Sequence, residues 1–264
     1  METKNQKSKK IGISSGLVIL GCGIIAFCFF QFVCGNPANF DAKGHPINNN
    51  IFGTLFQGGY VIPIVMTLLL TVFALSFERF IALRKARGTG NLVQFINNAK
   101  KSLEAGDINQ ARVLCDKQKG SVANILRAAL VRYEDIDKQE LSNDEKASLI
   151  AKEVEDATSL ELPTMEQNLP VIATISSLGT LFGLLGTVLG MIKSFGAMGQ
   201  EGAPDSTALA IGISEALMNT AMGIGTGAVA IIAYGFFSGK VTNITNAVNE
   251  IGFAIGQTFT TRKK

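Results

Sequence analysis

The chain has 264 residues, of which 47% are hydrophobic and 17% are charged, and its formal net charge is +3. Disordered chains have few apolar residues and many charges, and soluble domains are usually about 25% charged, so neither class fits this composition. The small net charge gives no indication of a nucleic-acid partner, and we expect none. The composition predicts a membrane protein.

Four stretches with almost no charge are long enough to cross a bilayer, which takes about 20 helical residues. They predict an all-α, polytopic membrane protein with four transmembrane helices and a helical cytoplasmic lobe. In chain order the predicted segments are a cytoplasmic tail (1–10), a transmembrane helix (11–34), an external loop (35–50), a transmembrane helix (51–78), the lobe (79–166), a transmembrane helix (167–194), an external loop (195–205), a transmembrane helix (206–239) and a cytoplasmic tail (240–264).

Lysine and arginine residues alternate between the flanks of these spans. The two tails and the lobe are rich in them, whereas the loop at 35–50 carries only Lys43. Short flanks rich in Lys and Arg stay in the cytoplasm. We therefore predict that both termini face the cytoplasm.

A cleaved signal peptide is the alternative for the first span, because the span follows a basic start. Its uncharged stretch, residues 11–34, is long for the apolar core of a signal peptide, and no small-x-small cleavage site precedes Asn36. We favour a permanent membrane helix.

The polar block between the second and third spans has helical patterns. Apolar residues with helical spacing predict an amphipathic helix over 92–103. Ser142 and Glu145 are typical of a capping box that opens a long helix. Pro163 and Pro170 are expected to bend or restart that helix as it enters the third span. We therefore expect a helical lobe that is continuous with the membrane helices.

The third span carries a stripe of small and hydroxyl-bearing residues. At about 100° per residue, one face collects Ser176, Thr180, Gly183, Thr187, Met191 and Ser194. Glycines at close-packing spacing accompany the stripe: Gly179, Gly183, Gly186 and Gly190. Two interpretations remain open at this point. The hydroxyls are either bonded to their own backbone in a packed helix pair, or they line a path for water or for a partner side chain.

Glu215 is the only charged residue well inside an apolar stretch. It lies about 13 Å into its helix, where an ionised carboxylate facing lipid would cost several kcal/mol. The side chain must therefore face protein or water, or be protonated. A functional carboxylate and a satisfied polar group in a packed interface are the two interpretations.

The fourth span has two polar faces. Glu215 shares one with Asn219, Met222 and Thr226, and the smaller face beside it holds Ala216, Thr220, Gly223 and Gly227. Glu215 and Thr220 are about 140° apart around the helix. We therefore expect a ring of several copies, in which one face lies toward a central pore and the other toward a neighbour.

Three motifs resemble the MotA/TolQ/ExbB proton-channel family. The run LPVIATI at 169–175, followed by GLLGTVLGM at 183–191, is similar to the second core span of that family. The run GISEALMNTAMG at 212–223 is similar to the third, and FERFIALR at 77–84 to the end of the first. The resemblance covers about 51–240 and is strongest to ExbB, with TolQ close behind.

This resemblance implies a homo-oligomeric ring, typically a pentamer, in the inner membrane of a bacterium. The ring would surround an ExbD-like single-span protein with an intramembrane Asp and act on a TonB-like protein, with membrane lipid outside. It would convert the proton motive force into work for TonB-dependent uptake across the outer membrane. A TolQ-like role in the cell-envelope Tol system and a non-conducting membrane scaffold are the alternatives. The external loops would then be periplasmic.

The resemblance also implies residue roles. The proton path would involve Thr187, Thr220 and Glu215. The supporting polar lining would be Ser176, Thr180, Ser194, Asn219 and Thr226, and the close-packing glycines would be Gly183, Gly186, Gly190 and Gly223. The span at 11–34 is extra, because most relatives have three spans. It would either pack outside the ring or bind another subunit.

A proton path needs a group that gains and loses a proton, and no Asp lies within any predicted span. Either Glu215 carries the proton, or a partner supplies a carboxylate opposite the hydroxyl stripe. We favour the partner, because Glu215 lies near one end of its span. Thr187 and Thr220 would then solvate the proton without titrating. The sequence has no nucleophile–base constellation and no metal-ligand spacing, so we expect no enzyme, no metal and no cofactor.

Overall fold

The computed structural model describes most of the chain, in four stretches: residues 14–42, 45–47, 50–198 and 206–261. The predicted tail at 1–10 and most of the predicted loop at 195–205 lie outside them. Within these stretches the elements are helices, and no β-strand occurs apart from one isolated bridge between Phe40 and Pro46. The all-α fold class is confirmed.

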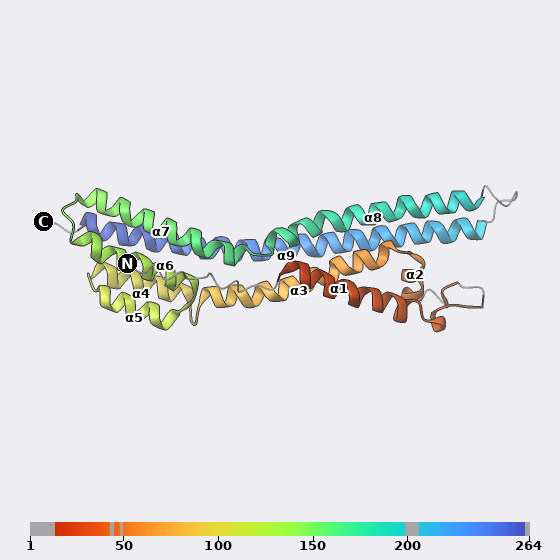
Figure 1. Ribbon diagram of the computed structural model, residues 1–264, viewed down its shortest axis with the longest axis horizontal. Helices are drawn as coiled ribbons and strands as arrows, with labels where there is room; N and C mark the ends of the chain where they lie inside the picture. Colours follow the sequence, from red (N-terminus) through yellow and green to blue (C-terminus); the bar gives the residue numbers. More distant parts are fainter. Residues whose placement is uncertain (1–13, 43–44, 48–49, 199–205, 262–264) are drawn as a thin grey trace. The chain divides into compact units, whose positions relative to one another are not determined.

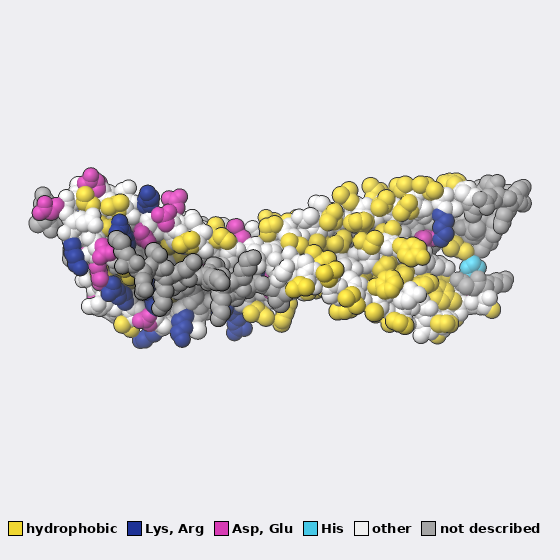
Figure 2. Space-filling view, viewed as in Figure 1, with side chains coloured by type: hydrophobic (Ala, Val, Ile, Leu, Met, Phe, Trp, Pro, Cys, Tyr) yellow, Lys and Arg dark blue, Asp and Glu magenta, His cyan; other side chains and the backbone are white. Residues whose placement is uncertain are grey.

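Four helical stretches of the described chain are long and apolar enough to cross a membrane: Ser15–Cys34, Val61–Glu104, Leu169–Gly196 and Leu209–Thr258. They match the four predicted spans in order, which confirms the polytopic membrane class. Figure 2 shows hydrophobic side chains gathered over the membrane-spanning helices and charged side chains gathered over the lobe. The orientation of the termini stays a prediction.

Contacts divide the chain into two compact units. The described part of the first, which we call the membrane unit, comprises residues 14–77 and 168–236, and that of the second, the lobe, comprises 78–167 and 237–261. The membrane unit contains α1 (Ser15–Phe29), the π-helix η1 (Phe30–Cys34), the short η2 (Pro37–Asn39), α2 (Ile51–Gln57), the first part of α3 (Val61–Arg87), α8 (Leu169–Met198) and the first part of α9 (Ser206–Thr261).

The N-terminal span packs against other helices of its own chain. Phe30 stacks on Phe56 with the ring centroids 5.0 Å apart. These residues belong to an apolar group that we call the N-terminal cluster: Phe30, Cys34, Leu55 and Ile62, with Phe56, Met66, Met218 and Met222 packed around them. The first span therefore shares an apolar cluster with α2, α3 and α9.

The second predicted span is interrupted near its start. Its apolar residues begin at Ile51, but α2 ends at Gln57 and α3 begins only at Val61. Gly59 has a φ of +66°, a left-handed conformation that glycine adopts without steric cost. A run of apolar residues is compatible with one long helix or two shorter ones, so the apolar pattern did not predict this turn.

The helix break before α8 lies after Pro163, not at it. α7 (Asn143–Glu166) continues through Pro163, and the turn comes at Asn168, which has a φ of +66°. Pro170 is the second residue of α8, where the missing N–H costs little because the first helical N–H groups lack partners anyway. Pro170 is therefore compatible with the start of the new helix.

The lobe consists of α4 (Leu92–Glu104), α5 (Ile108–Gln118), α6 (Gly120–Asp137), α7 and the ends of α3 and α9. The predicted apolar face of α4 is buried, and the predicted capping box at Ser142 and Glu145 is formed. Hydrogen bonds from the Ser142 hydroxyl and backbone N–H lower the pKa of the Glu145 carboxyl.

The segment predicted as a C-terminal tail, 240–264, is helical as far as Thr261. Its apolar residues are buried in the lobe: Val241, Ile244, Val248, Ile251 and Ile255. A methyl carbon added to Gly252 would lie 2.9 Å from Val154, so α9 and α7 are in close contact there. The predicted tail was given no structure, and the helix continues into it because Lys240 marks the end of the apolar stretch but not the end of the helix.

Arg79 is fully buried in the lobe, although the sequence marked it only as a flanking charge. Its guanidinium is paired with Glu78 and donates hydrogen bonds to the carbonyl oxygens of Thr164 and Met165, at 3.1 and 3.3 Å. Arg79 thereby joins α3 to the C-terminal end of α7.

Candidate functional site

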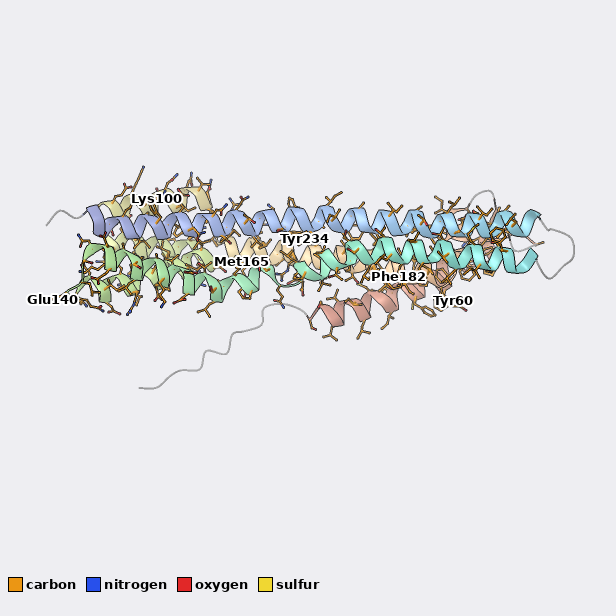
Figure 3. The ribbon with its side chains drawn as sticks, turned by 90° about the horizontal axis from the view of Figure 1, so that it is seen from above. Tyr60, Lys100, Glu140, Met165, Phe182 and Tyr234 are labelled. Carbon is orange, nitrogen blue, oxygen red and sulfur yellow. The ribbon has the colours of Figure 1, made fainter. Side chains whose placement is uncertain are left out.

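The helices α8 and α9 run side by side in the membrane unit (Figures 1 and 3), and glycines line their contact. A methyl carbon added to Gly183 would lie 2.9 Å from Cα of Gly223, and one added to Gly190 would lie 3.1 Å from Cβ of Ala216. Gly186 faces Asn219 in the same way. Because no side chain separates them, the backbones approach closely enough for short side chains to meet.

Thr187 and Thr220 meet across this contact. Their hydroxyl oxygens lie 2.7 Å apart, and either hydroxyl could donate. Both are also within hydrogen-bonding distance of the Gly183 carbonyl oxygen, at 3.2 and 3.3 Å respectively. Two hydroxyls and one carbonyl therefore form a small polar group between apolar helices, in which a hydroxyl proton has two alternative acceptors.

The other hydroxyls of the stripe differ in their hydrogen-bond partners. Thr180 and Ser194 donate to carbonyl oxygens of their own helix, at Ser176 and Gly190. Ser176 instead donates across the contact to the Gly227 carbonyl oxygen at 3.2 Å. Ordinary helix packing thus accounts for Thr180 and Ser194, whereas Ser176 helps to hold α8 against α9.

The Glu215 side chain is buried against other helices of its own chain. Only 9% of its side chain is exposed, and its Oε2 lies 3.2 Å from Nζ of Lys193 on α8. Its Oε1 faces the turn between α2 and α3, where a methyl carbon added to Gly59 would lie 3.2 Å away. An ion pair and close packing thus keep this carboxylate away from lipid within a single chain.

Lys193 was not named as a site residue, because it lies at the C-terminal edge of the predicted span at 167–194. The register of α8 against α9 could have identified Lys193. When antiparallel helices bring Thr187 to Thr220, a residue near the C-terminal end of α8 faces one near the N-terminal end of α9.

Asn219 and Thr226, on the same face as Glu215, are deeply buried. Their exposed fractions are 2% and 1%, and in the described part of the chain neither Oδ1 of Asn219 nor Oγ1 of Thr226 has a hydrogen-bond partner. The Asn219 oxygen lies 3.0 Å from where a methyl carbon on Gly58 would be. Glu215 and Asn219, one helical turn apart, therefore both face the Gly58–Gly59 turn. Tyr60, labelled in Figure 3, follows this turn and is 87% exposed.

These features define a polytopic helical membrane protein in which a hydroxyl pair and an ion pair with a buried carboxylate join α8 to α9. No group of three His, Cys, Asp or Glu side chains suited to a metal ion occurs among the described residues. The sequence profile of the MotA/TolQ/ExbB proton channel family matches residues 117–250, which is half of the chain. The chain belongs to this family.

Relatives of two kinds are similar to the chain. A putative biopolymer transport protein ExbB homolog of Methanothermobacter thermautotrophicus is 26% identical over 201 residues, which cover 73% of this chain and 66% of that protein. The Tol-Pal system protein TolQ of Pseudomonas aeruginosa is 36% identical over 91 residues, covering 34% of this chain and 39% of that protein. The TolQ of Haemophilus influenzae is 24% identical over 202 residues, covering 74% and 87%.

The chain thus spans less than two thirds of the first two relatives and most of the third. Because relatives with ExbB and TolQ names both match, the chain is a family member of the ExbB/TolQ type.

Proposed function

We propose that the protein is the proton-channel subunit of an ExbB/ExbD-type motor in a bacterial inner membrane. The motor would convert the proton motive force into work for TonB-dependent uptake through the outer membrane. The observation that carries this proposal is the hydroxyl contact between Thr187 and Thr220, which lies in an apolar helix hairpin beside a buried Glu215. Membership of a proton-channel family supports it.

The hydroxyl pair is suited to passing a proton but not to storing one. A hydroxyl donates and accepts hydrogen bonds, yet it does not titrate near neutral pH. Glu215 is the only carboxylate on the described part of α8 and α9 within the membrane unit, and it is paired with Lys193. We therefore assign the titrating group to the intramembrane Asp of an ExbD-like partner, which would face Thr187 and Thr220.

A homo-oligomer, most simply a pentamer, would supply the surface that encloses such a partner. Large apolar side chains on α8 are exposed in the single chain, among them Leu181, Leu184, Val188 and Ile192. They suit contact with lipid, with a second copy or with a partner helix. A TonB-like protein would receive the motion. Neither an enzymatic activity nor a cofactor is part of this proposal.

A TolQ-like role is the second candidate, and the TolQ relatives favour it. The two roles differ in the partner and share the proton path. Mass spectrometry of the proteins that copurify with the native complex separates them, because an ExbD-like and a TolR-like partner have different sequences.

Proton flux in liposomes tests the proposal. Thr187→Val keeps the shape of the side chain and removes the hydroxyl, so flux through the complex with its single-span partner is expected to fall at least tenfold while assembly is retained. Thr174→Val is the matched control on the same helix, because Thr174 is exposed and bonds only to the Pro170 carbonyl oxygen of its own turn. Unchanged flux in Thr187→Val would reject the role of this hydroxyl. No flux in the unmodified complex would favour the scaffold.

A further inference from the structure

Lys193 and Glu215 form a charge pair that is isolated within the membrane unit. Apart from Asp41 in the loop after η1, they are the only Asp, Glu, Lys or Arg residues among the described residues of this unit. Their exposures differ: 74% of the Lys193 side chain is exposed, against 9% of Glu215. The carboxylate is thus fixed inside the helix bundle, and the ammonium reaches it from the surface on a flexible stem.

Two side-chain oxygens of α9, one from Glu215 and one from Asn219, face the turn at Gly58 and Gly59. Oε1 of Glu215 faces Gly59, and within 4 Å of the position of a methyl carbon on Gly59 there is no other side-chain or non-local atom. One turn along α9, the Oδ1 atom of Asn219 has no hydrogen-bond partner and faces Gly58. Only 2% of Asn219 is exposed. A carboxylate and an amide oxygen beside a glycine turn are the ligand types that hard metal cations such as Na⁺ and Ca²⁺ prefer.

We infer that Glu215 and Asn219 form a latent monovalent-cation site, that the Lys193 ammonium neutralises its negative charge, and that Lys193 thereby keeps Na⁺ and K⁺ from binding beside the Thr187–Thr220 hydroxyl pair. Because Lys193 is part of α8, its ammonium stays near the Glu215 carboxylate at a high effective concentration, whatever the salt concentration of the solution. A metal cation needs several oxygen ligands and a negative charge that is not already balanced. Lys193 balances the negative charge of Glu215. A proton passing between the Thr187 and Thr220 hydroxyls does not have to displace Lys193.

A purely structural ion pair makes a different prediction. If Lys193 only holds α8 against α9, its loss destabilises the protein equally in every salt. If it stands in for a mobile cation, its loss makes stability depend on Na⁺, because a ligand that binds only the folded state raises the Tm.

The first experiment measures the Tm of the purified protein in sodium chloride and in choline chloride of equal ionic strength. The unmodified protein is expected to have the same Tm in both salts. Lys193→Gln is expected to have a Tm about 3 °C higher in Na⁺ at roughly ten times the Kd. Lys193→Arg keeps the cation and is expected to show no Na⁺ response. In the double variant Lys193→Gln with Glu215→Gln the response disappears, because the carboxylate is gone.

Equal Tm values for Lys193→Gln in the two salts would overturn the inference, and so would failure of this variant to fold in both. Folding in Na⁺ alone would support it. This experiment does not require the protein to conduct protons.

The second experiment rests on the proposed function. Proton flux through the complex in liposomes is measured in Na⁺ and in choline. The unmodified complex is expected to be insensitive to the cation, and Lys193→Gln is expected to lose flux severalfold in Na⁺ relative to choline. No flux in the unmodified complex would count against the proposed function and leave the Tm result to decide on the cation site. Normal flux combined with a Na⁺-insensitive Lys193→Gln variant would reject the selectivity role.

Discussion

Adding one methyl group at Gly223 tests the close contact between α8 and α9. The new carbon would lie 2.5 Å from Cα of Gly183 and 2.6 Å from the Gly179 carbonyl oxygen, both backbone atoms, whereas ordinary contact begins at 3.4 Å. The helices must therefore separate by about 1 Å. Overpacking of this kind costs about 1–3 kcal/mol.

Gly225→Ala is the matched control, because nothing lies within 4 Å of its new carbon. Both substitutions gain the same helix propensity, about 1 kcal/mol, so the difference between them isolates the steric cost. At about 2–4 °C for each kcal/mol, Gly223→Ala is expected to unfold several degrees below Gly225→Ala in a thermal melt of the purified protein.

The same separation affects the hydroxyl pair. Widening the contact by about 1 Å would take the Thr187–Thr220 distance of 2.7 Å past the range of an O–H···O hydrogen bond. Proton flux in Gly223→Ala is therefore expected to fall together with the Tm. Equal melting temperatures for the two alanine variants would refute the packing argument, since they would show that the backbones are not in contact.

Two further predictions concern the lobe. Arg79→Met removes the buried ion pair with Glu78 and the hydrogen bonds to the Thr164 and Met165 carbonyl oxygens, and it should lower the free energy of unfolding by about 3–5 kcal/mol. The exposed Arg84→Met should change it little, and chemical denaturation of the two variants compares them. Burial raises the pKa of the Cys115 thiol from 9.0 to about 11, so the thiol ionises at a lower pH in the unfolded chain than in the folded protein. The contribution of the neutral thiol to folding stability is therefore fully present below about pH 9 and is lost as the pH rises toward 11. Cys115 is accordingly expected to resist alkylation at pH 8 until the lobe unfolds, and rapid labelling of the native protein, located by peptide mapping, would contradict its burial.

Local patterns made much of the fold predictable. The four apolar stretches, the amphipathic face of α4 and the capping box at Ser142 each depend on residues close together in sequence, and each is present. The continuation of α9 to Thr261 was not predicted, because a charge such as Lys240 ends a membrane span without ending a helix.

The site was predictable residue by residue but not in its pairings. Thr187, Thr220 and Glu215 were identified from helix faces and from the family motifs. Their partners depend on the register of α8 against α9 and on the turn at Gly58–Gly59, which no local pattern encodes. Lys193 was missed for this reason.

The N-terminal cluster has a different energetic basis from a water-soluble core. In a bilayer the alternative neighbours of Phe30, Leu55 and Ile62 are acyl chains, which are as apolar as the side chains themselves, so burial alone contributes little. The position of the first span in this cluster is then maintained by the fit of its side chains, such as the stacked rings of Phe30 and Phe56. A helix held in this way could be gained or lost at small energetic cost, because lipid chains can take the place of its side chains.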